Sequence, residues 1–227
     1  MILITGATGG IGQNILKKLT SLNEDIICLH KNNINLNNLV KSKFIKYHKV
    51  NLEDEIEVLN FSEKLLFEKI TIIHLAAVYV DKLIMNQTLS EFDSHYKINF
   101  RSIFIIVKTL LPKMLSLGGK VILFSSPSVY KAHVGSSAYA SSKAALEIFS
   151  DVLNNEYSKF NIRSYNVKLG YYDSGMYKKL SKRVRLKLLS ETNNLEFSSI
   201  TELQDLILSI INDKFSDNLV RLDMSIT

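Results

Sequence analysis

The 227-residue sequence lacks the features that would place a protein outside the cell or inside a membrane. Its single cysteine, Cys28, cannot form an internal disulfide and lies in the apolar run Ile26–Leu29, where a buried structural thiol is expected. The most apolar stretch, Ile103–Val107, is interrupted by Lys108, whereas a membrane helix needs about twenty apolar residues. Met1–Ile4 already has the pattern of a strand, with no secretory signal before it. These absences predict a soluble cytoplasmic protein with no membrane partner.

Linkers, nucleic-acid-binding signatures and metal-ligand spacings are also missing. With two prolines and 46% hydrophobic residues, the chain is expected to bury one core as a single domain, residues 1–227. The formal net charge is +6, but most basic residues are spread along the chain, so no nucleic acid is expected as a partner. No metal is expected, because no cysteine pair supports the histidines and their spacings do not suit metal ligands: His30, His48, His74, His95 and His133.

Short apolar segments alternate with longer amphipathic segments along the whole chain. This alternation predicts an α/β fold, a doubly wound parallel sheet with helices on both faces. The strands are nearly all apolar, as expected when both faces of a sheet are covered. The expected strands are Ile2–Thr5, Asp25–His30, Phe44–Val50, Ile70–Ala76, Lys120–Ser125, Ile162–Lys168 and Leu219–Asp223. The expected helices are Gly10–Leu22, Leu52–Leu66, Ser90–Leu117, Ala138–Lys159, Gly175–Leu189 and Thr201–Asn212.

A glycine-rich segment, Thr5-Gly6-Ala7-Thr8-Gly9-Gly10-Ile11-Gly12, joins the first expected strand to the first expected helix. A dinucleotide places its pyrophosphate against the backbone amides of a helix N-terminus, where the helix dipole favours negative charge. Side chains would obstruct this approach, which explains the glycines at the turn and at the helix contact. The position between strand and helix predicts a Rossmann-type dinucleotide site. Its expected cofactor-binding residues are Gly6, Thr8, Gly9, Gly10, Ile11 and Gly12.

A tyrosine and a lysine, Tyr139 and Lys143, stand four residues apart near the start of an expected helix. This spacing puts both side chains on one face. A free tyrosine has a pKa near 10, and a nearby lysine together with the positive nicotinamide ring of an oxidised cofactor would move that pKa toward neutrality. Tyr139 is therefore the expected general acid and base. Ser126, at the end of the fifth strand and thirteen residues before Tyr139, has a hydroxyl that can hydrogen-bond a substrate carbonyl, with Ser125 and Ser128 as nearby alternatives.

The Thr-Gly-x-x-x-Gly-x-Gly segment, Ser126 and the Tyr-x-x-x-Lys pair, in this order, resemble the short-chain dehydrogenase/reductase family. The resemblance extends from Thr5 to about Asp223. It implies a nicotinamide-dependent oxidoreductase that interconverts a carbonyl and a secondary alcohol by hydride transfer. Within the family, Asp81–Met85 is similar to beta-ketoacyl-carrier-protein reductases of the compact single-domain type.

Other site residues follow from the resemblance. Asn99, in the segment Tyr96–Ser102, is implied to complete a catalytic tetrad with an amide that relays protons through a water to Lys143. The segment Gly170–Met176 is implied to hold the nicotinamide carboxamide, with Ser174 where threonine is usual. Outside the glycine loop, the expected cofactor-binding residues are His30, Lys31, Asn51, Leu52, Ala76, Ala77, Tyr139, Lys143, Gly170, Tyr172 and Ser174.

The sequence also departs from the family pattern. Leu75–Val78, after the fourth strand, lacks the usual glycine, and Asn51 stands where an aspartate usually contacts the adenine side. Leu169 replaces the proline before Gly170, and the C-terminal segment lacks the customary glycine pair. The first departure bears on the cofactor pocket, and the last weakens an argument for a tetramer.

The choice of cofactor depends on the end of the second strand. An acid there would accept the ribose 2′-hydroxyl of NAD, and a basic residue would pair with the 2′-phosphate of NADP. Glu24 and Asp25 lie at the start of the strand, so no acid is expected in reach of its end, where His30 is followed by Lys31. NADP(H) is therefore favoured and NAD(H) remains the alternative, since Lys31 is also compatible with an ordinary solvated lysine. Against NADP(H), Gly9 occupies a position that often carries a basic residue in NADP-dependent relatives.

The substrate stays open between a beta-ketoacyl thioester and a sugar or sugar nucleotide. His74–Ala77 and Ser126–Tyr130 resemble larger sugar-nucleotide epimerases and dehydratases, but only 57 residues follow Gly170, too few for their substrate domain. The alternative from another class is a non-catalytic NADP(H)-binding module or redox sensor. The expected partner is a small carbonyl or alcohol, anionic or carrier-linked in one hypothesis.

Two further expectations concern surfaces. Ile98–Leu117 is apolar nearly all round, which predicts burial on more than one side and, by the resemblance, a homodimer or higher homo-oligomer. Basic residues in the expected helix after Gly175 form two adjacent stripes that could attract an anionic substrate or simply solvate the helix. These residues are Lys178, Lys182 and Arg185 in one stripe and Lys179, Arg183 and Lys187 in the other.

Overall fold

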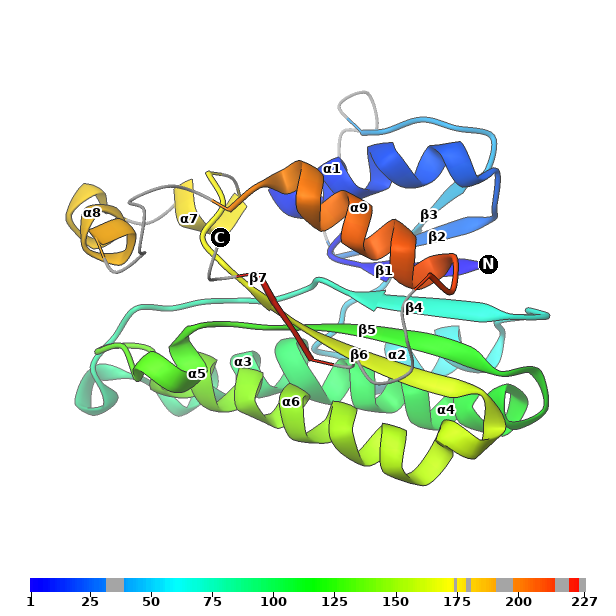
Figure 1. Ribbon diagram of the computed structural model, residues 1–227. Coiled ribbons are helices and arrows are strands. Elements are labelled where there is room, and N and C mark those ends of the chain that lie inside the picture. Colours follow the sequence, from blue (N-terminus) through cyan, green and yellow to red (C-terminus); the bar gives the residue numbers. More distant parts are fainter. Residues whose placement is uncertain (32–38, 174, 179–180, 191–197, 215–220, 225–227) are drawn as a thin grey trace.

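The computed structural model of the protein describes residues 1–31, 39–173, 175–178, 181–190, 198–214 and 221–224. Its strands form a single sheet in the order β3-β2-β1-β4-β5-β6-β7, and every pair of neighbours is parallel (Figure 1). The predicted fold class is therefore confirmed. The strands are β1 Ile2–Thr5, β2 Ile26–His30, β3 Ile45–Lys49, β4 Ile70–His74, β5 Gly119–Ser125, β6 Ile162–Leu169 and β7 Arg221–Met224.

Helices cover both faces of the sheet (Figure 1). Helices α1 and α9 pack on one face with the buried side chains of Ile4 and Phe124, while α2, α4 and α6 pack on the other with Leu3 and Leu123. Adjacent residues of one strand thus point into separate cores, which explains the continuous apolar runs. The α-helices are α1 Gly10–Leu19, α2 Glu55–Glu63, α3 Leu89–Tyr96, α4 Ser102–Leu117, α5 Ser128–Lys131, α6 Ser137–Tyr157, α7 Gly175–Lys178, α8 Lys182–Ser190 and α9 Ile200–Ile211.

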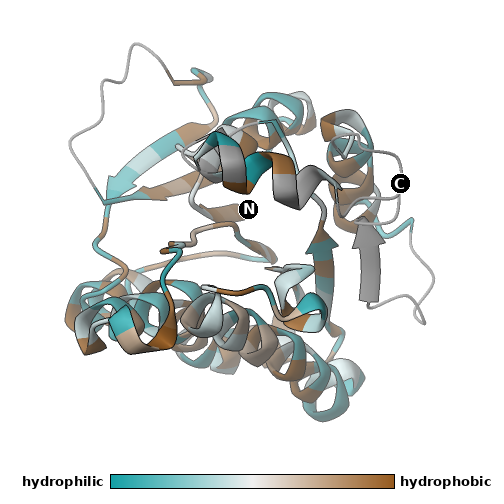
Figure 2. Ribbon diagram, turned by 90° about the vertical axis from the view of Figure 1, so that its left-hand side faces the viewer, coloured by the Kyte–Doolittle hydropathy of each residue, from teal (hydrophilic) through white to brown (hydrophobic). Residues whose placement is uncertain are grey.

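The edge strand β3 differs from the central strands. Lys46, His48 and Lys49 are exposed, whereas all five residues of β4 are buried. In Figure 2 the two helical layers lie above and below the strands, with brown, hydrophobic segments on the strands and on helix faces toward them. A polar edge discourages pairing with another sheet.

The expected long helix Ser90–Leu117 is confirmed as continuous helical backbone, but it is not α-helical throughout. Helix α3 ends at Tyr96, a π-helical turn occupies Lys97–Arg101, and α4 begins at Ser102. Hydrophobic periodicity cannot reveal this turn, because both helices are amphipathic and no proline or glycine separates them. A π turn inserts an extra residue and often marks a functional position. Asn99 lies at the middle of this turn.

Several other boundaries shift for identifiable reasons. Helix α2 begins at Glu55 rather than Leu52, because the carboxylate of Asp54 accepts hydrogen bonds from the amides of Ile56 and Glu57 and caps the helix. The expected helix Gly175–Leu189 is broken, since Ser181 is not helical between α7 and α8. Lys179 and Leu180 lie outside the described residues. The two predicted basic stripes therefore do not lie on one helix.

Among the residues that the structure describes, no helix is long and apolar enough to span a membrane.

Candidate functional site

The residues expected to act together lie at the carboxyl edge of the sheet. Because all strands are parallel, the segments that follow β1, β4, β5 and β6 meet at this edge. They carry the glycine loop, Leu75–Val78, Ser126 and Gly170. Helix α6 starts beside them and adds Tyr139 and Lys143 in its first two turns.

The glycine loop fits a dinucleotide pyrophosphate. A Cβ at Gly6, where φ is +73°, would lie 2.6 Å from the Ala76 backbone nitrogen, and a Cβ at Gly12 would lie 2.3 Å from the Gly6 carbonyl oxygen. The Gly9 amide donates to the same carbonyl at 3.0 Å, which closes the turn. Gly9 caps α1 without a side-chain hydrogen bond, and no acidic residue occupies the first turn of the helix. This helix N-terminus is therefore available to an anion.

Ser126, Tyr139 and Lys143 are brought together as predicted. Burial raises the pKa of Tyr139 to about 12, and the neighbouring Ser126 side chain opposes this rise. The Lys143 Nζ donates to the Phe124 carbonyl at 2.8 Å and lies 5.8 Å from the centroid of the Tyr139 ring. Burial lowers the pKa of Lys143 to about 8. Ser126 itself exchanges hydrogen bonds with Ser128.

Burial of the phenolate is the main cause of the raised Tyr139 pKa. The lowering expected from Lys143 together with an oxidised nicotinamide ring stays a prediction. At neutral pH Tyr139 is a protonated phenol, which is the form required to donate a proton to an alkoxide.

Asn99 is completely buried and its amide is fully used. Its Oδ1 accepts from the Val78 amide at 2.8 Å, while its Nδ2 donates to the Val78 carbonyl at 3.1 Å and to the Ser142 hydroxyl at 2.9 Å. Ser142 in turn donates to the Tyr139 carbonyl at 2.8 Å. The Asn99 side chain therefore joins the segment after β4, which lacks a glycine, to the catalytic helix. Both Nδ2 hydrogens are used in these contacts, and the proton relay implied for Asn99 stays a prediction.

His74, at the end of β4, connects Asn99 to the glycine loop. Its Nε2 donates to the Asn99 carbonyl at 3.1 Å, and its Nδ1 lies 2.8 Å from the Thr5 hydroxyl. A carbonyl only accepts, so Nε2 carries the proton and Nδ1 accepts from Thr5. Burial, with the nearby charge of Lys143, lowers the pKa of His74 to about 3, so the ring is neutral. The Thr5 hydroxyl also accepts from the Ala76 amide at 3.2 Å.

The segment after β4 also places Tyr79 against Tyr139. The rings of Tyr79 and Tyr139 meet edge to face with centroids 5.0 Å apart. Burial raises the pKa of Tyr79 to about 12, and the charge of Asp81 adds to this effect. Tyr79 is therefore a protonated aromatic wall beside the reacting hydroxyl.

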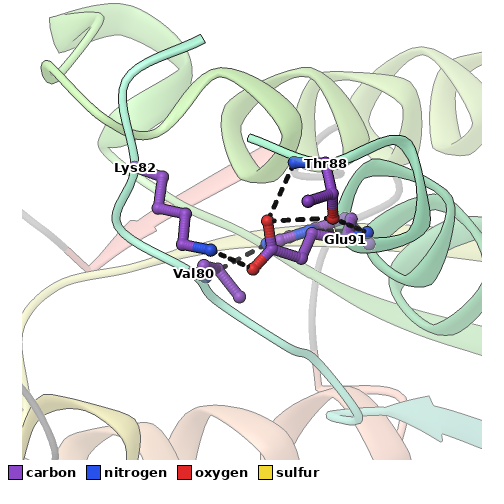
Figure 3. Close-up of polar contacts among 5 residues, drawn as sticks. Val80, Lys82, Thr88 and Glu91 are labelled. Atoms are coloured by element: carbon purple, nitrogen blue, oxygen red, sulfur yellow. Dashed lines mark hydrogen bonds and ion pairs between the residues drawn. The ribbon is translucent and has the colours of Figure 1, made fainter. Parts of the chain in front are cut away.

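Polar contacts with α3 hold this segment in place (Figure 3). The Lys82 ammonium pairs with the Glu91 carboxylate, and Glu91 also accepts from the Thr88 amide at 2.9 Å. The Thr88 hydroxyl caps α3 by accepting from the Glu91 amide at 3.2 Å. The Val80 amide donates to His95 Nε2 at 3.2 Å. The chain between β4 and α3 is thus fixed at several points.

The predicted cofactor discriminator, Lys31, has an acidic partner. Its ammonium is paired with the carboxylate of Glu53, which follows β3. The expectation that no acid is in reach is therefore wrong, because β3 lies beside β2 and its carboxyl end delivers Glu53 to the same place. Asn51 makes a local turn there, with Oδ1 accepting from the Glu53 amide at 3.2 Å. His30 ends β2 and is partly buried.

The segment after β6 places Gly170 at the site edge, but the Tyr172 side chain points elsewhere. Tyr172 is buried in the core formed with α1 and α9, and burial raises the pKa of its hydroxyl. Only the backbone of Tyr172 is therefore available to a nicotinamide. Ser174 lies outside the described residues. The remaining predicted positions are the partly buried Thr8, Ile11, Leu52 and Ala77 and the buried Ala76.

A cavity of about 650 Å³ borders the start of α6 and reaches Ser128, the hydrogen-bond partner of Ser126. Ala140, Ser141 and Ala144 line it, rather than Tyr139 or Lys143. The segment with Ile84 and Met85, both largely exposed, forms another wall.

Sequence reasoning missed His74, Tyr79 and Glu53 as members of the site. His74 carried one usable signal, since a histidine ending an apolar strand at the binding edge of a parallel sheet needs a partner. Tyr79 and Glu53 carried none, because their neighbours are set by turns and by strand order.

Sequence comparisons identify the family of the chain. The family profile described as short chain dehydrogenase matches residues 1–185. The 3-oxoacyl-acyl-carrier-protein reductase FabG of Aquifex aeolicus is 26% identical over 221 residues, covering 93% of this chain and 89% of its own. The FabG of Rickettsia conorii is 30% identical over 186 residues, covering 81% and 77%. The L-xylulose reductase of Caenorhabditis elegans is 24% identical over 227 residues, covering 95% and 89%.

Solved structures share the fold. A 4-hydroxyisoleucine dehydrogenase mutant in complex with NADH and succinate has a TM-score of 0.87 at 20% identity, covering 100% of this chain and 98% of its own. A blue fluorescent protein from a metagenomic library, in complex with NADPH, has a TM-score of 0.86 at 18% identity, covering 100% and 97%. With the glycine loop and the family profile, these findings show that the chain belongs to the short-chain dehydrogenase/reductase family, as an oxidoreductase acting on alcohol and carbonyl groups.

Proposed function

We propose that the protein reduces a carbonyl to a secondary alcohol, and catalyses the reverse reaction, with Tyr139 as the general acid and base. The observation that carries this proposal is the grouping of Ser126, Tyr139 and Lys143 beside the glycine loop. A nicotinamide cofactor bound at that loop supplies or accepts the hydride. The same grouping argues against the alternative of a non-catalytic cofactor-binding module or redox sensor.

Each residue has a distinct task in the reduction. The Ser126 hydroxyl leaves Ser128 and donates to the substrate carbonyl oxygen, which fixes the carbonyl beside Tyr139. Tyr139 then donates its proton to the developing alkoxide. The Lys143 ammonium stabilises the phenolate that this transfer leaves behind, and its pKa of about 8 lets it exchange protons near neutral pH. His74 and Asn99 hold the surrounding backbone in place.

The decisive experiment replaces Tyr139 with phenylalanine. Tyr139→Phe should lower turnover at least about a hundredfold, the usual scale for loss of a general acid, while cofactor affinity stays nearly unchanged. Tyr157→Phe, at the other end of the same helix, is the matched control and should retain activity. Turnover is followed by nicotinamide absorbance with a panel of carbonyl compounds. Activity retained in Tyr139→Phe would exclude this residue as the acid.

For the substrate, we favour a beta-ketoacyl thioester. Support comes from the resemblance of Asp81–Met85 and from the FabG relatives in the comparison. A ketose is the second candidate, supported by the L-xylulose reductase relative. Acetoacetyl thioesters and xylulose in one assay panel separate the two. Turnover of xylulose without turnover of the thioester would reverse the order.

NADP(H) remains our preferred cofactor, because Lys31 follows the second strand at the place expected for a 2′-phosphate. Its ion pair with Glu53 means that this preference depends on a second residue. The single sheet supports one domain over residues 1–227, and the lone, buried Cys28 supports a cytoplasmic location.

We also propose that the protein self-associates through the outer faces of α4 and α6. Phe104, Ile148 and Val152 are exposed there to 42%, 62% and 41%. Such apolar surface on adjacent helices favours a homo-oligomeric interface. Sedimentation at micromolar concentration should give a dimer or larger species, and Ile148→Glu should dissociate it. Leu66→Glu, at an exposed leucine after α2, is the control. A wild-type monomer would contradict the proposal.

A further inference from the structure

Glu53 stands at the junction of three elements. One carboxylate oxygen pairs with the Lys31 ammonium, and the other accepts from the Ser94 hydroxyl on α3 at 2.5 Å. Its backbone amide is fixed to Asn51 Oδ1. The hydrogen bond from Lys31, with that from Ser94, holds the pKa of Glu53 below its ordinary value. The carboxylate is therefore charged at neutral pH and held by contacts on both sides.

The position of this ion pair matters for the cofactor. In this type of fold, the group that follows the second strand meets the adenosine ribose, so the ribose 2′ position comes close to Lys31. A 2′-phosphate can bind the Lys31 ammonium only if it displaces the Glu53 carboxylate or shares the ammonium with it. In either case the phosphate lies near a fixed negative charge. A ribose 2′-hydroxyl meets no such conflict, because a carboxylate accepts its hydrogen bond.

We propose that Glu53 is a specificity-determining residue that reduces the preference of the protein for NADP(H) over NAD(H). It acts in two ways, by occupying Lys31 and by placing a negative charge beside the site of the 2′-phosphate. Lys31 by itself favours a cofactor with a 2′-phosphate, and Glu53 weakens this preference. This inference rests on the proposed cofactor site.

Ser94 holds the Glu53 carboxylate through the oxygen that does not pair with Lys31. It belongs to α3, whose N-terminus is capped by Thr88 and Glu91, so the hydroxyl is carried on a fixed element. Loss of this hydroxyl would let Glu53 turn away from Lys31 more easily. Ser94→Ala should therefore change the cofactor preference in the same direction as loss of the Glu53 charge, and by less.

The test measures cofactor binding by isothermal titration calorimetry, without substrate. Glu53→Gln should tighten NADPH binding by about tenfold, the scale on which removing a like charge near a bound ion acts, and leave NADH binding unchanged or slightly weaker. Glu55→Gln is the matched control, because it removes the same charge from the first residue of α2, next to the capping residue Asp54. Its carboxylate pairs with Arg101 instead, so it should move neither constant.

A double variant assigns the gain to Lys31. Lys31→Met in the Glu53→Gln background should abolish the improvement for NADPH. If the wild-type protein binds neither cofactor, the proposed function fails and this inference fails with it. If wild type binds both, but Glu53→Gln leaves the ratio of the two constants unchanged, only the role of Glu53 is overturned. An equal gain in Glu55→Gln would overturn it as well, since net charge alone would then account for the effect.

Discussion

Two parts of the same sheet edge are built in opposite ways. Around the ends of β1 and β4, a buried centre of Thr5, His74, Asn99 and Lys143 is held by short hydrogen bonds among groups that are almost inaccessible to solvent. Around the end of β2 and the start of α3, a charged rim of Lys31, Glu53, Lys82 and Glu91 is held by ion pairs that reach solvent.

The difference separates two tasks. A reacting hydroxyl must be held in place within fractions of an ångström, and buried hydrogen bonds with no alternative partners provide this. Recognition of a phosphate or a ribose needs charges that can exchange partners, and half-exposed side chains provide that. The centre should therefore respond to substitution with large changes in stability, and the rim with small ones.

The largest effect is expected at the glycine that touches the centre. Gly6→Ala forces a Cβ against the Ala76 backbone at a φ of +73°, so either β1 or β4 must shift. We expect the free energy of unfolding to fall by about 3 kcal/mol or more, and the heat of cofactor binding to disappear. Gly9→Ala is the control, since its Cβ would meet only the Gly6 carbonyl at 3.3 Å. Denaturant titration that ranks both variants equally would contradict the comparison.

His74→Phe probes the hydrogen bonds of the centre with little change of volume. It leaves the Asn99 carbonyl and the Thr5 hydroxyl without their partner, and should cost about 2–3 kcal/mol of unfolding free energy, with turnover falling more than cofactor affinity. Because the pKa of His74 falls to about 3 on folding, the unfolded state binds the extra proton between about pH 3 and 6.5. Wild type should lose stability on acidification through that window, whereas His74→Phe should lose less.

His48→Phe is the matched control for this histidine, since His48 is exposed on the edge strand β3. Its effect should stay within about 0.5 kcal/mol. If the two variants unfold at the same denaturant concentration, the hydrogen bonds of His74 do not contribute to the free energy of unfolding.

Lys143→Met should separate stability from activity in the centre. Burial lowers the pKa of Lys143 to about 8, so the unfolded state binds more protons between about pH 8 and 10.4 and wild-type stability should rise with pH across that window. Below pH 8 the buried charge is a cost. At pH 7 the variant should therefore be more stable than wild type by about 1–3 kcal/mol, with turnover at least about a hundredfold lower. A variant less stable than wild type at every pH would refute this account.

The smallest effect is expected at the charged rim. Glu91→Gln removes the pairing with Lys82 but keeps a hydrogen-bonding side chain (Figure 3). The contacts with Lys82 and Thr88 hold the pKa of Glu91 at about 2, so its contribution is present above the ordinary carboxyl pKa and is lost as the pH falls through about 2. Thermal unfolding should give a small loss at pH 7 that disappears in acid. A loss as large as that of His74→Phe would erase the distinction between centre and rim.

Much of this architecture was predictable from the sequence, because it depends on local pattern. The strands β1 and β4 are recognisable in the sequence as apolar runs, and the glycine loop lies between the end of β1 and the start of α1. The pair Tyr139 and Lys143 needs only the periodicity of a helix to share a face. Each of these inferences uses residues within about one helical turn or one strand of one another.

The remainder depends on contacts between distant segments. The π turn at Lys97–Arg101 is accompanied by bonds from Asn99 to His74 and Val78, more than twenty residues earlier, which no periodicity encodes. Glu53 reaches Lys31 only because β3 pairs with β2 in the sheet order. Prediction failed where sheet order, rather than local pattern, decided the outcome.

The place of β1 in the middle of the sheet has a consequence for the order in which the molecule is made. Ile2 is in register with Ile26 on one side and with Thr71 on the other, so β1 stays half-paired until residue 74 has been synthesised. Parallel pairings between such distant segments are slow to form, and chains fold from the N-terminus during synthesis. The residues of the glycine loop and of β4 are synthesised before Asn99, Ser126 and Tyr139. A ribosome-bound chain that ends just after β4 thus contains the cofactor cradle without any of its reactive side chains.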